Sequence, residues 1–159
     1  WAAARPGGRV FDLMADFVER SKAALPAGNV EAAATEIEAL CTADDDVTVI
    51  NNIIAAQSEN PWIQKAAATL ASGSPLSARL IAEQIRRCKG LSLKAAFQAE
   101  ALLSTTIIRQ PEFAEGVRAL LIDKDKNPVW QHASPADVPQ ALIEHHFTAP
   151  WSQNPLHDL

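Results

Sequence analysis

Histidines gather near the end of the sequence, and imidazole is a common metal ligand and general base. His145 and His146 follow Glu144, with His132 before them and His157 after them. Neighbouring side chains on a helix point about 100° apart, so His145 and His146 cannot bind one ion in the usual way. The pair of histidines four residues apart that zinc sites on helices use is absent. We therefore expect a solvent-facing helix end here and no metal site.

The two cysteines, Cys41 and Cys88, are the candidate nucleophiles. Arg87 and Lys89 flank Cys88, and neighbouring cations favour the reactive thiolate. Both cysteines fall within helical patterns, so a small buried or half-buried residue is the simpler interpretation. Two cysteines cannot form a disulfide framework, which fits buried thiols in a reducing compartment and a cytoplasmic location.

The other polar motifs complete no catalytic or phosphate-binding site. The sequence has no GxSxG elbow, no glycine-rich phosphate loop and no dinucleotide fingerprint. The run from Asp44 to Asp46 lacks the glycine and the closing glutamate of a calcium loop. It suits the start of a helix instead, where the dipole favours acidic side chains. From the residues alone we assign no catalytic residue and no cofactor.

The composition is that of a helical, mildly acidic protein. The 159 residues include 14 Lys+Arg and 19 Asp+Glu, a net charge of −5, and 48% are apolar; this suits one domain or part of one. The acidic balance argues against a nucleic-acid partner, and no apolar run reaches the roughly 18 residues of a membrane span. Residues 79–126 carry nine basic and six acidic residues, so this part of the sequence could attract an anion, although solvated helix faces are the simpler interpretation. The sequence begins with Trp1 rather than Met, which fits a piece of a longer protein.

The spacing of apolar residues predicts the elements that must position these groups. Residues from Val10 to Val18 fit an amphipathic helix of about four turns. A second helix is expected over residues 29–41, with Asn29 as its cap. Residues 47–54 are ambiguous, because their β-branched side chains favour a strand while their apolar stripe has helical spacing. We favour the helix.

Capping residues predict where the later helices begin. Asn60 and Ser74 each precede a proline, and Ser92 precedes an apolar periodic run. We expect Pro111 to end the helix that Ser92 opens, and a last helix over residues 139–147. For the helix that Ser74 opens, we expect Leu76, Leu80, Ile81 and Ile85 to face inward and Arg79, Glu83, Arg86 and Arg87 to face outward, with Gly90 ending it in a left-handed conformation. The fold class predicted from these patterns is all-α.

Residues 74–130 resemble a known family. The run begins with SPLS and is most specific at EFAEGVRALLIDKDKNPVW, residues 112–130. It resembles the C-terminal region of the 3-hydroxyisobutyryl-CoA hydrolases, in the enoyl-CoA hydratase/isomerase (crotonase) superfamily. Residues 29–73 are similar to the helical linker region of that family in pattern only. Residues 1–28 form an N-terminal helix of unclear placement, and residues 74–159 a C-terminal helical domain.

The resemblance implies a helical C-terminal segment that lacks the ββα-spiral core of crotonase-like proteins. Family members hydrolyse a CoA thioester in valine breakdown, and their oxyanion hole and catalytic carboxylate lie upstream of the matched region. This sequence has no Gly-Gly-Gly oxyanion run and no Pro-Glu…Pro-Asp-x-Gly stretch. The resemblance therefore carries over no catalytic residue, and it implies that the segment alone is inactive.

Binding roles do carry over as expectations. The resemblance implies that Lys124, Lys126 and Trp130 meet the CoA part of an acyl-CoA substrate, that Glu115 pairs with Arg118, and that Gly116 allows close helix approach. The expected partners are acyl-CoA, the catalytic core of the same protein and further copies in a homo-oligomer, with no nucleic acid and no membrane. Part of an enoyl-CoA hydratase or isomerase, or a free-standing helical interaction module, stays open as an alternative.

Overall fold

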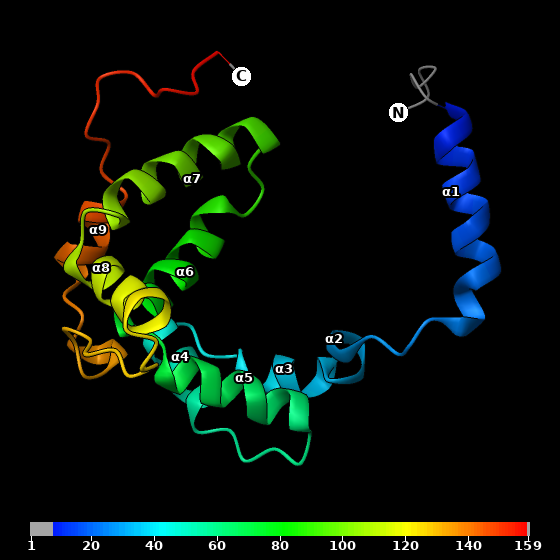
Figure 1. Ribbon diagram of the computed structural model, residues 1–159, viewed down its shortest axis with the longest axis horizontal. Coiled ribbons are helices and arrows are strands. Elements are labelled where there is room, and N and C mark those ends of the chain that lie inside the picture. Colours follow the sequence, from blue (N-terminus) through cyan, green and yellow to red (C-terminus); the bar gives the residue numbers. More distant parts are fainter. Residues whose placement is uncertain (1–7, 159) are drawn as a thin grey trace. The chain divides into compact units, whose positions relative to one another are not determined.

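The computed structural model describes residues 8–158, and every regular element in this range is a helix (Figure 1). The prediction of an all-α chain is therefore confirmed. The chain divides into two compact units, Trp1–Ala34 and Thr35–Leu159. The α-helices are α1 Gly8–Ser21, α2 Asn29–Ala32, α3 Ala34–Leu40, α4 Asp46–Ile54, α5 Pro61–Ser72, α6 Pro75–Cys88, α7 Leu93–Ile107, α8 Pro111–Val117 and α9 Gln140–His146. Short helices at η1 Lys22–Ala24, η2 Arg118–Ile122 and η3 Pro135–Asp137 complete them. Within this range no helix is both long and apolar enough to cross a membrane.

The first unit contains the expected amphipathic helix, α1. Its polar side includes Arg20, whose guanidinium lies 2.8 Å from the Asp16 carboxylate. Its apolar side chains are all largely exposed: Val10, Phe11, Leu13, Met14, Phe17 and Val18. This unit therefore buries little apolar surface of its own.

The prediction of a single helix over residues 29–41 is wrong. The chain forms two helices there, and Ala33 leaves the helical conformation between them, with φ −101° and ψ 6°. The cap is Gly28 rather than Asn29, which already lies within the first turn of α2. Asn29 makes no capping bond, so the capping tendency of its side chain did not decide where the helix begins.

The acidic run at residues 44–46 lies at the start of α4, as expected, and Asp45 caps that helix by accepting a hydrogen bond from the Thr48 amide. The other predicted caps are present. Asn60 caps α5 through the Trp62 amide, Ser74 caps α6 through the Ser77 amide, and Ser92 caps α7 through the Ala95 amide. Each of these bonds satisfies an amide that has no partner within its own helix. Gly90 ends the α6 region with φ +80°, as expected.

Residues 47–54 are helical, as the apolar stripe predicted. They lie in α4, which packs against α5 and α6 and buries Ile50. The cap at Asp45 and the contact face on two neighbouring helices outweigh the β-branched composition.

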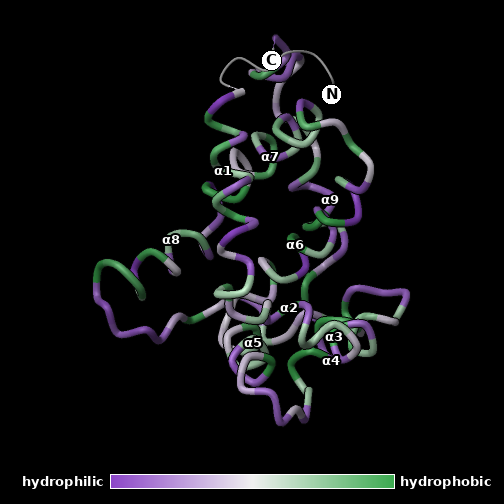
Figure 2. Tube along the Cα trace, turned by 90° about the vertical axis from the view of Figure 1, so that its right-hand side faces the viewer, coloured by the Kyte–Doolittle hydropathy of each residue, from purple (hydrophilic) through white to green (hydrophobic). Residues whose placement is uncertain are grey.

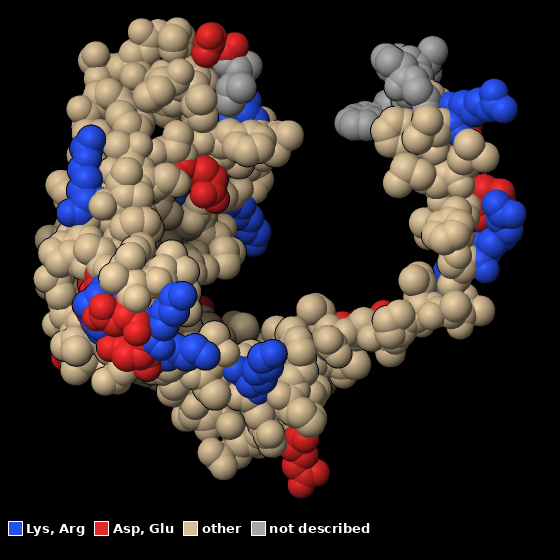
Figure 3. Space-filling model, in the orientation of Figure 1, with Lys and Arg blue, Asp and Glu red and all other residues tan. Residues whose placement is uncertain are grey.

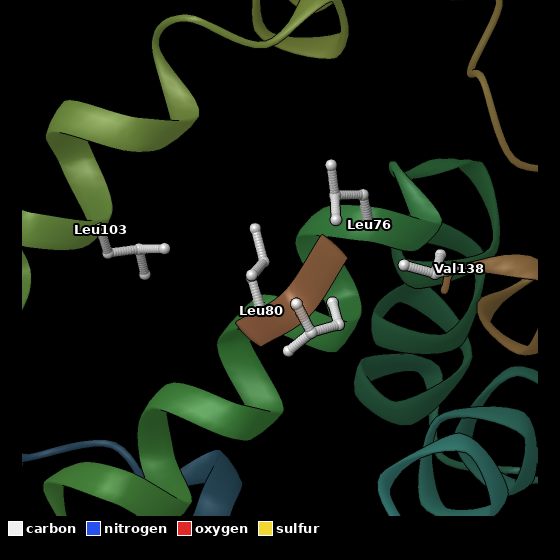
Figure 4. Packing of buried hydrophobic residues seen from close by; sticks show 5 residues of the cluster. Leu76, Leu80, Leu103 and Val138 are labelled. Carbon is white, nitrogen blue, oxygen red and sulfur yellow. The ribbon is translucent and has the colours of Figure 1, made fainter. Parts of the chain in front are cut away.

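The core of the second unit lies where α6, α7 and α9 meet. Helix α9 contacts both α6 and α7, and the connection before it contributes Val138 (Figure 4). Leu76 and Leu80 of α6 are each 1% exposed, in agreement with the prediction. The cluster is Leu76, Leu80, Leu103, Val138 and Ile143.

Half of the prediction for the faces of α6 is wrong. Arg79 and Glu83 are buried, whereas Ile81 and Ile85 are 57% and 70% exposed. Arg79 donates hydrogen bonds to Asp46 at 2.6 Å and to Gln140 at 2.8 Å. Its charge is thus paired by residues from α4 and α9, and a buried charge with such partners is tolerated.

Glu83 is paired from within its own helix. Burial raises the pKa of Glu83, but the hydrogen bonds from Arg86 and Arg87 outweigh that effect, and its pKa is lowered overall. Arg87 also bonds Glu144 of α9 at 2.6 Å and lies 4.4 Å from the centre of the Phe147 ring. The second face of α6 is therefore held by ion pairs rather than by isoleucines.

Other expected burial patterns also differ. His146 has no exposed surface, so the predicted solvent-facing end holds for His145 and is wrong for His146. The His146 Nδ1 lies 2.7 Å from the Leu142 carbonyl, which makes it the protonated nitrogen. Cys41 is exposed and Cys88 only partly buried, so the prediction of buried thiols is wrong for Cys41.

Candidate functional site

The functional candidates lie on the segment from α8 to Trp130. Pro111 occupies the first turn of α8, where its missing N–H costs nothing. The helix widens into the π-helical turn η2, closed by the Asp123 amide on the Arg118 carbonyl at 2.8 Å. Figure 2 shows a hydrophobic stretch here followed by a hydrophilic turn.

The turn after η2 has an unusual backbone. Lys124 has φ 57° and Lys126 has φ 56°, in the left-handed region that non-glycine residues seldom adopt. The Lys126 amide donates to the Ala119 carbonyl at 3.0 Å, which ties the turn to η2. Strained backbone of this kind persists only where neighbouring contacts hold it in place.

Arg118 supplies those contacts. Its guanidinium lies 2.7 Å from each of the Glu115, Asp123 and Asp125 carboxylates. It also donates to the Asn127 carbonyl at 3.1 Å. The expected Glu115–Arg118 pair is confirmed, and it is part of a larger cluster. Figure 3 shows acidic and basic side chains gathered over α8 and the following turn.

The charges in this cluster shift one another's protonation. Hydrogen bonds from Arg118 and from the Val129 amide lower the pKa of Glu115 to about 2. Arg118 and the Asn127 amide lower the pKa of Asp125. The bonds to Glu115, Asp125 and Asp123 raise the pKa of Arg118. The pairing therefore favours the charged forms of Glu115, Asp125 and Arg118.

An apolar pocket lies on the other side of α8. It has a volume of about 520 Å³ and is walled by residues of α8, η2 and the start of α6, among them Phe113, Leu120 and Leu76. Two of the three predicted binding residues, Lys126 and Trp130, line it, and Lys124 does not. Among residues 8–158, its other charged wall residue is Glu112. The structure thus brings one lysine and one indole to a mainly apolar cavity.

Trp130 is fixed at both ends. Its Nε1–H donates to the Ser72 carbonyl at the end of α5, at 3.1 Å. Its ring lies over Gly116, where an added Cβ would be 3.5 Å from the ring. The prediction that Gly116 allows two helices to approach is therefore wrong: its neighbour is an indole, at an ordinary contact distance.

A buried polar cluster lies at the same pocket and was not predicted from the sequence. Glu112 is 5% exposed and accepts from the Ser74 hydroxyl and from the Gln131 amide at 3.2 Å. The His132 Nδ1 lies 3.4 Å from the same carboxylate. Glu112 thus joins the start of α6, the start of α8 and the segment after the turn. Its sequence position, directly after a helix-opening proline, signalled only a favourable place for an acid.

This cluster is a structural tie rather than a catalytic triad. In a triad the base takes the proton of the nucleophile and the acid orients the base. Here Ser74 and His132 both bond Glu112, and the Ser74 oxygen also accepts the Ser77 amide. Among residues 8–158 no group of three or more His, Cys, Asp or Glu side chains could hold a metal ion.

Comparisons with known proteins agree with this fold. The chain is 39% identical over 94 residues to the mitochondrial 3-hydroxyisobutyryl-CoA hydrolase of Dictyostelium discoideum, covering 58% of this chain and 24% of the relative. It is 39% identical over 85 residues to the Danio rerio protein of the same name, covering 54% and 22%. The chain therefore spans about a quarter of the length of these relatives.

A solved structure matches almost the whole chain. It is a carnitinyl-CoA dehydratase from Mycobacterium thermoresistibile, with 27% identity and a TM-score of 0.72, over 94% of this chain and 43% of that one. The model of the enoyl-CoA hydratase/isomerase family matches residues 3–147. This match includes the first helix, α1, whose sequence alone did not indicate a family. The chain belongs to the enoyl-CoA hydratase/isomerase family.

Proposed function

We propose that this chain is the helical C-terminal part of a CoA-thioester hydrolase of the 3-hydroxyisobutyryl-CoA type. In this proposal it binds the CoA part of the substrate and supplies no catalytic group. The observation that carries the proposal is the pocket lined by Lys126 and Trp130. Both residues lie within the segment whose sequence resembles the hydrolases most specifically.

The chemistry of the pocket suits one end of an acyl-CoA. Its walls are mainly apolar and it has a single lysine. CoA combines apolar and aromatic portions with phosphate groups, and a lysine suits phosphate as a point charge. Trp130 offers an aromatic face on which flat rings stack. Lys124, in the same exposed turn, would add to the attraction at longer range.

The polar groups of this segment indicate why it would bind substrate without catalysing the reaction. Thioester hydrolysis requires donors aimed at the developing oxyanion and a positioned base or nucleophile. The buried Ser74 and Glu112 and the partly buried His132 bond one another, and Ser74 also caps a helix. We therefore expect the purified chain to leave 3-hydroxyisobutyryl-CoA intact, and activity to require the remaining part of a family protein.

A hydratase or dehydratase is the second candidate. The carnitinyl-CoA dehydratase matches 94% of this chain, a larger share than the named hydrolases match. The reaction type is set by residues outside the segment, so the pocket alone suits either enzyme. The higher identity of the hydrolases, 39% against 27%, favours hydrolysis.

Two further expectations stay with the proposal. Exposed apolar residues of α1 favour association with a catalytic core or with further copies of the chain. The cytoplasmic location stays a prediction, and the names of the Dictyostelium and Danio relatives call those proteins mitochondrial.

A hybrid enzyme tests the proposal. The chain would replace the matching C-terminal segment of the Dictyostelium discoideum hydrolase, and the hybrid would be assayed with 3-hydroxyisobutyryl-CoA and with an enoyl-CoA. We expect thiol release from the first and no hydration of the second. A well-folded hybrid that releases no thiol would contradict the proposal. The separate Dictyostelium core, without its C-terminal segment, is the control.

A further inference from the structure

The turn between η2 and Pro128 separates its charges between two sides of α8. Phe113, Gly116 and Val117 face the apolar pocket, as does Lys126. Glu115 and Arg118 face a second, smaller pocket on another side of the helix. The turn residues Asp123 and Asp125 reach Arg118 and not the apolar pocket.

This separation decides which charges an incoming anion meets. Aspartates alternate with lysines along residues 123–126, and without another partner they would pair with those lysines or repel a phosphate. Instead both aspartates bond Arg118 at 2.7 Å. Within the described part of the chain, neither Lys124 nor Lys126 forms an ion pair.

We propose that Arg118 is a positioning residue for anion binding: it holds Asp123 and Asp125 away from Lys124 and Lys126. This rests on the proposed function, because the anion it serves is the phosphate end of CoA. Arg118 itself does not line the apolar pocket, so its proposed role is exerted through the two aspartates rather than through a contact with the anion.

The guanidinium is suited to this role by its shape. It presents five N–H donors in a rigid fork, whereas a lysine ammonium is a compact charge with three donors. Arg118 uses Nε, Nη1 and Nη2 together, on three carboxylates and the Asn127 carbonyl. A lysine at position 118 would keep the charge but could not hold this set of partners.

The experiment is a cycle of variants of the full 159-residue chain, titrated with coenzyme A by calorimetry at low salt. Arg118→Lys keeps the net charge, so a role for charge alone leaves affinity unchanged. We expect this variant to bind coenzyme A about threefold to fivefold more weakly, the size of one exposed charge interaction. Arg109→Lys, on an exposed arginine outside the cluster, is the matched control and should bind like the native chain.

Neutralising Asp123 and Asp125 distinguishes the proposed positioning role of Arg118 from a general effect of charge on the affinity for coenzyme A. In the Arg118→Lys background, Asp123→Asn with Asp125→Asn should restore native affinity, because the freed carboxylates are gone. In the native background the same pair of changes should alter affinity less than about twofold, because Arg118 already holds both side chains. Equal gains in both backgrounds would overturn the inference. The native-background variant tests it even if Arg118→Lys fails to fold, since a large gain there means the aspartates already compete.

Coenzyme A binding by the native chain shows whether the proposed function fails or only this inference fails. Failure of the native chain to bind coenzyme A at millimolar concentration would contradict the proposed CoA contact, and the inference with it. Binding that Lys126→Ala weakens but Arg118→Lys leaves unchanged would overturn the inference alone.

Discussion

The indole Nε1 of Trp130 lies 3.1 Å from the carbonyl oxygen of Ser72, at the end of α5. This bond joins the segment after the lysine turn to a helix 58 residues earlier in the chain. It orients the indole over Gly116 and along one wall of the apolar pocket. The shape of the candidate site therefore depends on a contact outside the motif that identifies it.

Replacing Trp130 with Phe should show the value of this bond. The ring is kept approximately, but the Ser72 carbonyl loses its indole donor. We expect a loss of about 1 kcal/mol in the free energy of unfolding, measured by urea denaturation. Trp62→Phe is the control, because the Trp62 indole donates no hydrogen bond within the described residues. This variant should lose less of its free energy of unfolding. Equal losses in the two variants would mean that ring size alone matters.

Glu112→Gln should destabilise the junction of α6, α8 and the segment after the turn. The amide keeps the volume but removes the charge that Ser74 and Gln131 bond. We expect a loss of about 1–3 kcal/mol, because hydrogen bonds to a buried carboxylate are stronger than those to an amide. Glu38→Gln, at an exposed position of α3, should stay within about 0.5 kcal/mol. A neutral result at Glu112 would show that its bonds contribute no net stability.

Gly116→Ala should stabilise the chain. The added Cβ would lie at ordinary contact distance from the Trp130 ring, and alanine is favoured over glycine within a helix by about 0.5–1 kcal/mol. Gly90→Ala offers the opposite case, because its φ of +80° is strained for any other residue. In thermal unfolding, the melting temperature should therefore rise for Gly116→Ala and fall for Gly90→Ala. A fall for both would mean that the Trp130 contact is tighter than this geometry allows.

Stability should depend on pH through Glu115. Its pKa falls from an ordinary value of 4.5 to about 2 on folding, because Arg118 and the Val129 amide bond the charged form. The contribution is fully present above pH 4.5 and is lost as the pH falls from 4.5 toward 2. The difference in urea midpoint between the native chain and Glu115→Gln should narrow over this interval. A difference that stays constant from pH 6 to pH 2.5 would contradict the assignment.

Local signals in the sequence predicted the helix starts well. The caps at Asn60, Ser74 and Ser92 depend on bonds to amides two or three residues away, which sequence can reveal. The buried Arg79 could not be predicted in this way. Its partners, Asp46 and Gln140, come from distant parts of the chain and meet only in the folded unit.

The same distinction applies to the site. The motif at residues 112–130 indicated Lys124, Lys126 and Trp130, of which Lys126 and Trp130 line one pocket and Lys124 does not. It gave no sign of the bond from Trp130 to Ser72 or of the tie between Glu112 and Ser74. Those contacts depend on how α5, α6 and α8 pack, which no spacing within a single helix specifies.

The lysine turn gives the most direct test of the central claim, that this segment binds CoA without taking part in the chemistry. Lys124→Ala with Lys126→Ala would be measured in the hybrid enzyme with 3-hydroxyisobutyryl-CoA at low and high salt. We expect KM to rise about threefold to tenfold at low salt, with kcat nearly unchanged, the pattern of lost uniform binding. The effect should shrink as salt screens the charges. An unchanged KM at low salt together with a lower melting temperature would contradict the claim and leave the lysines a structural role only.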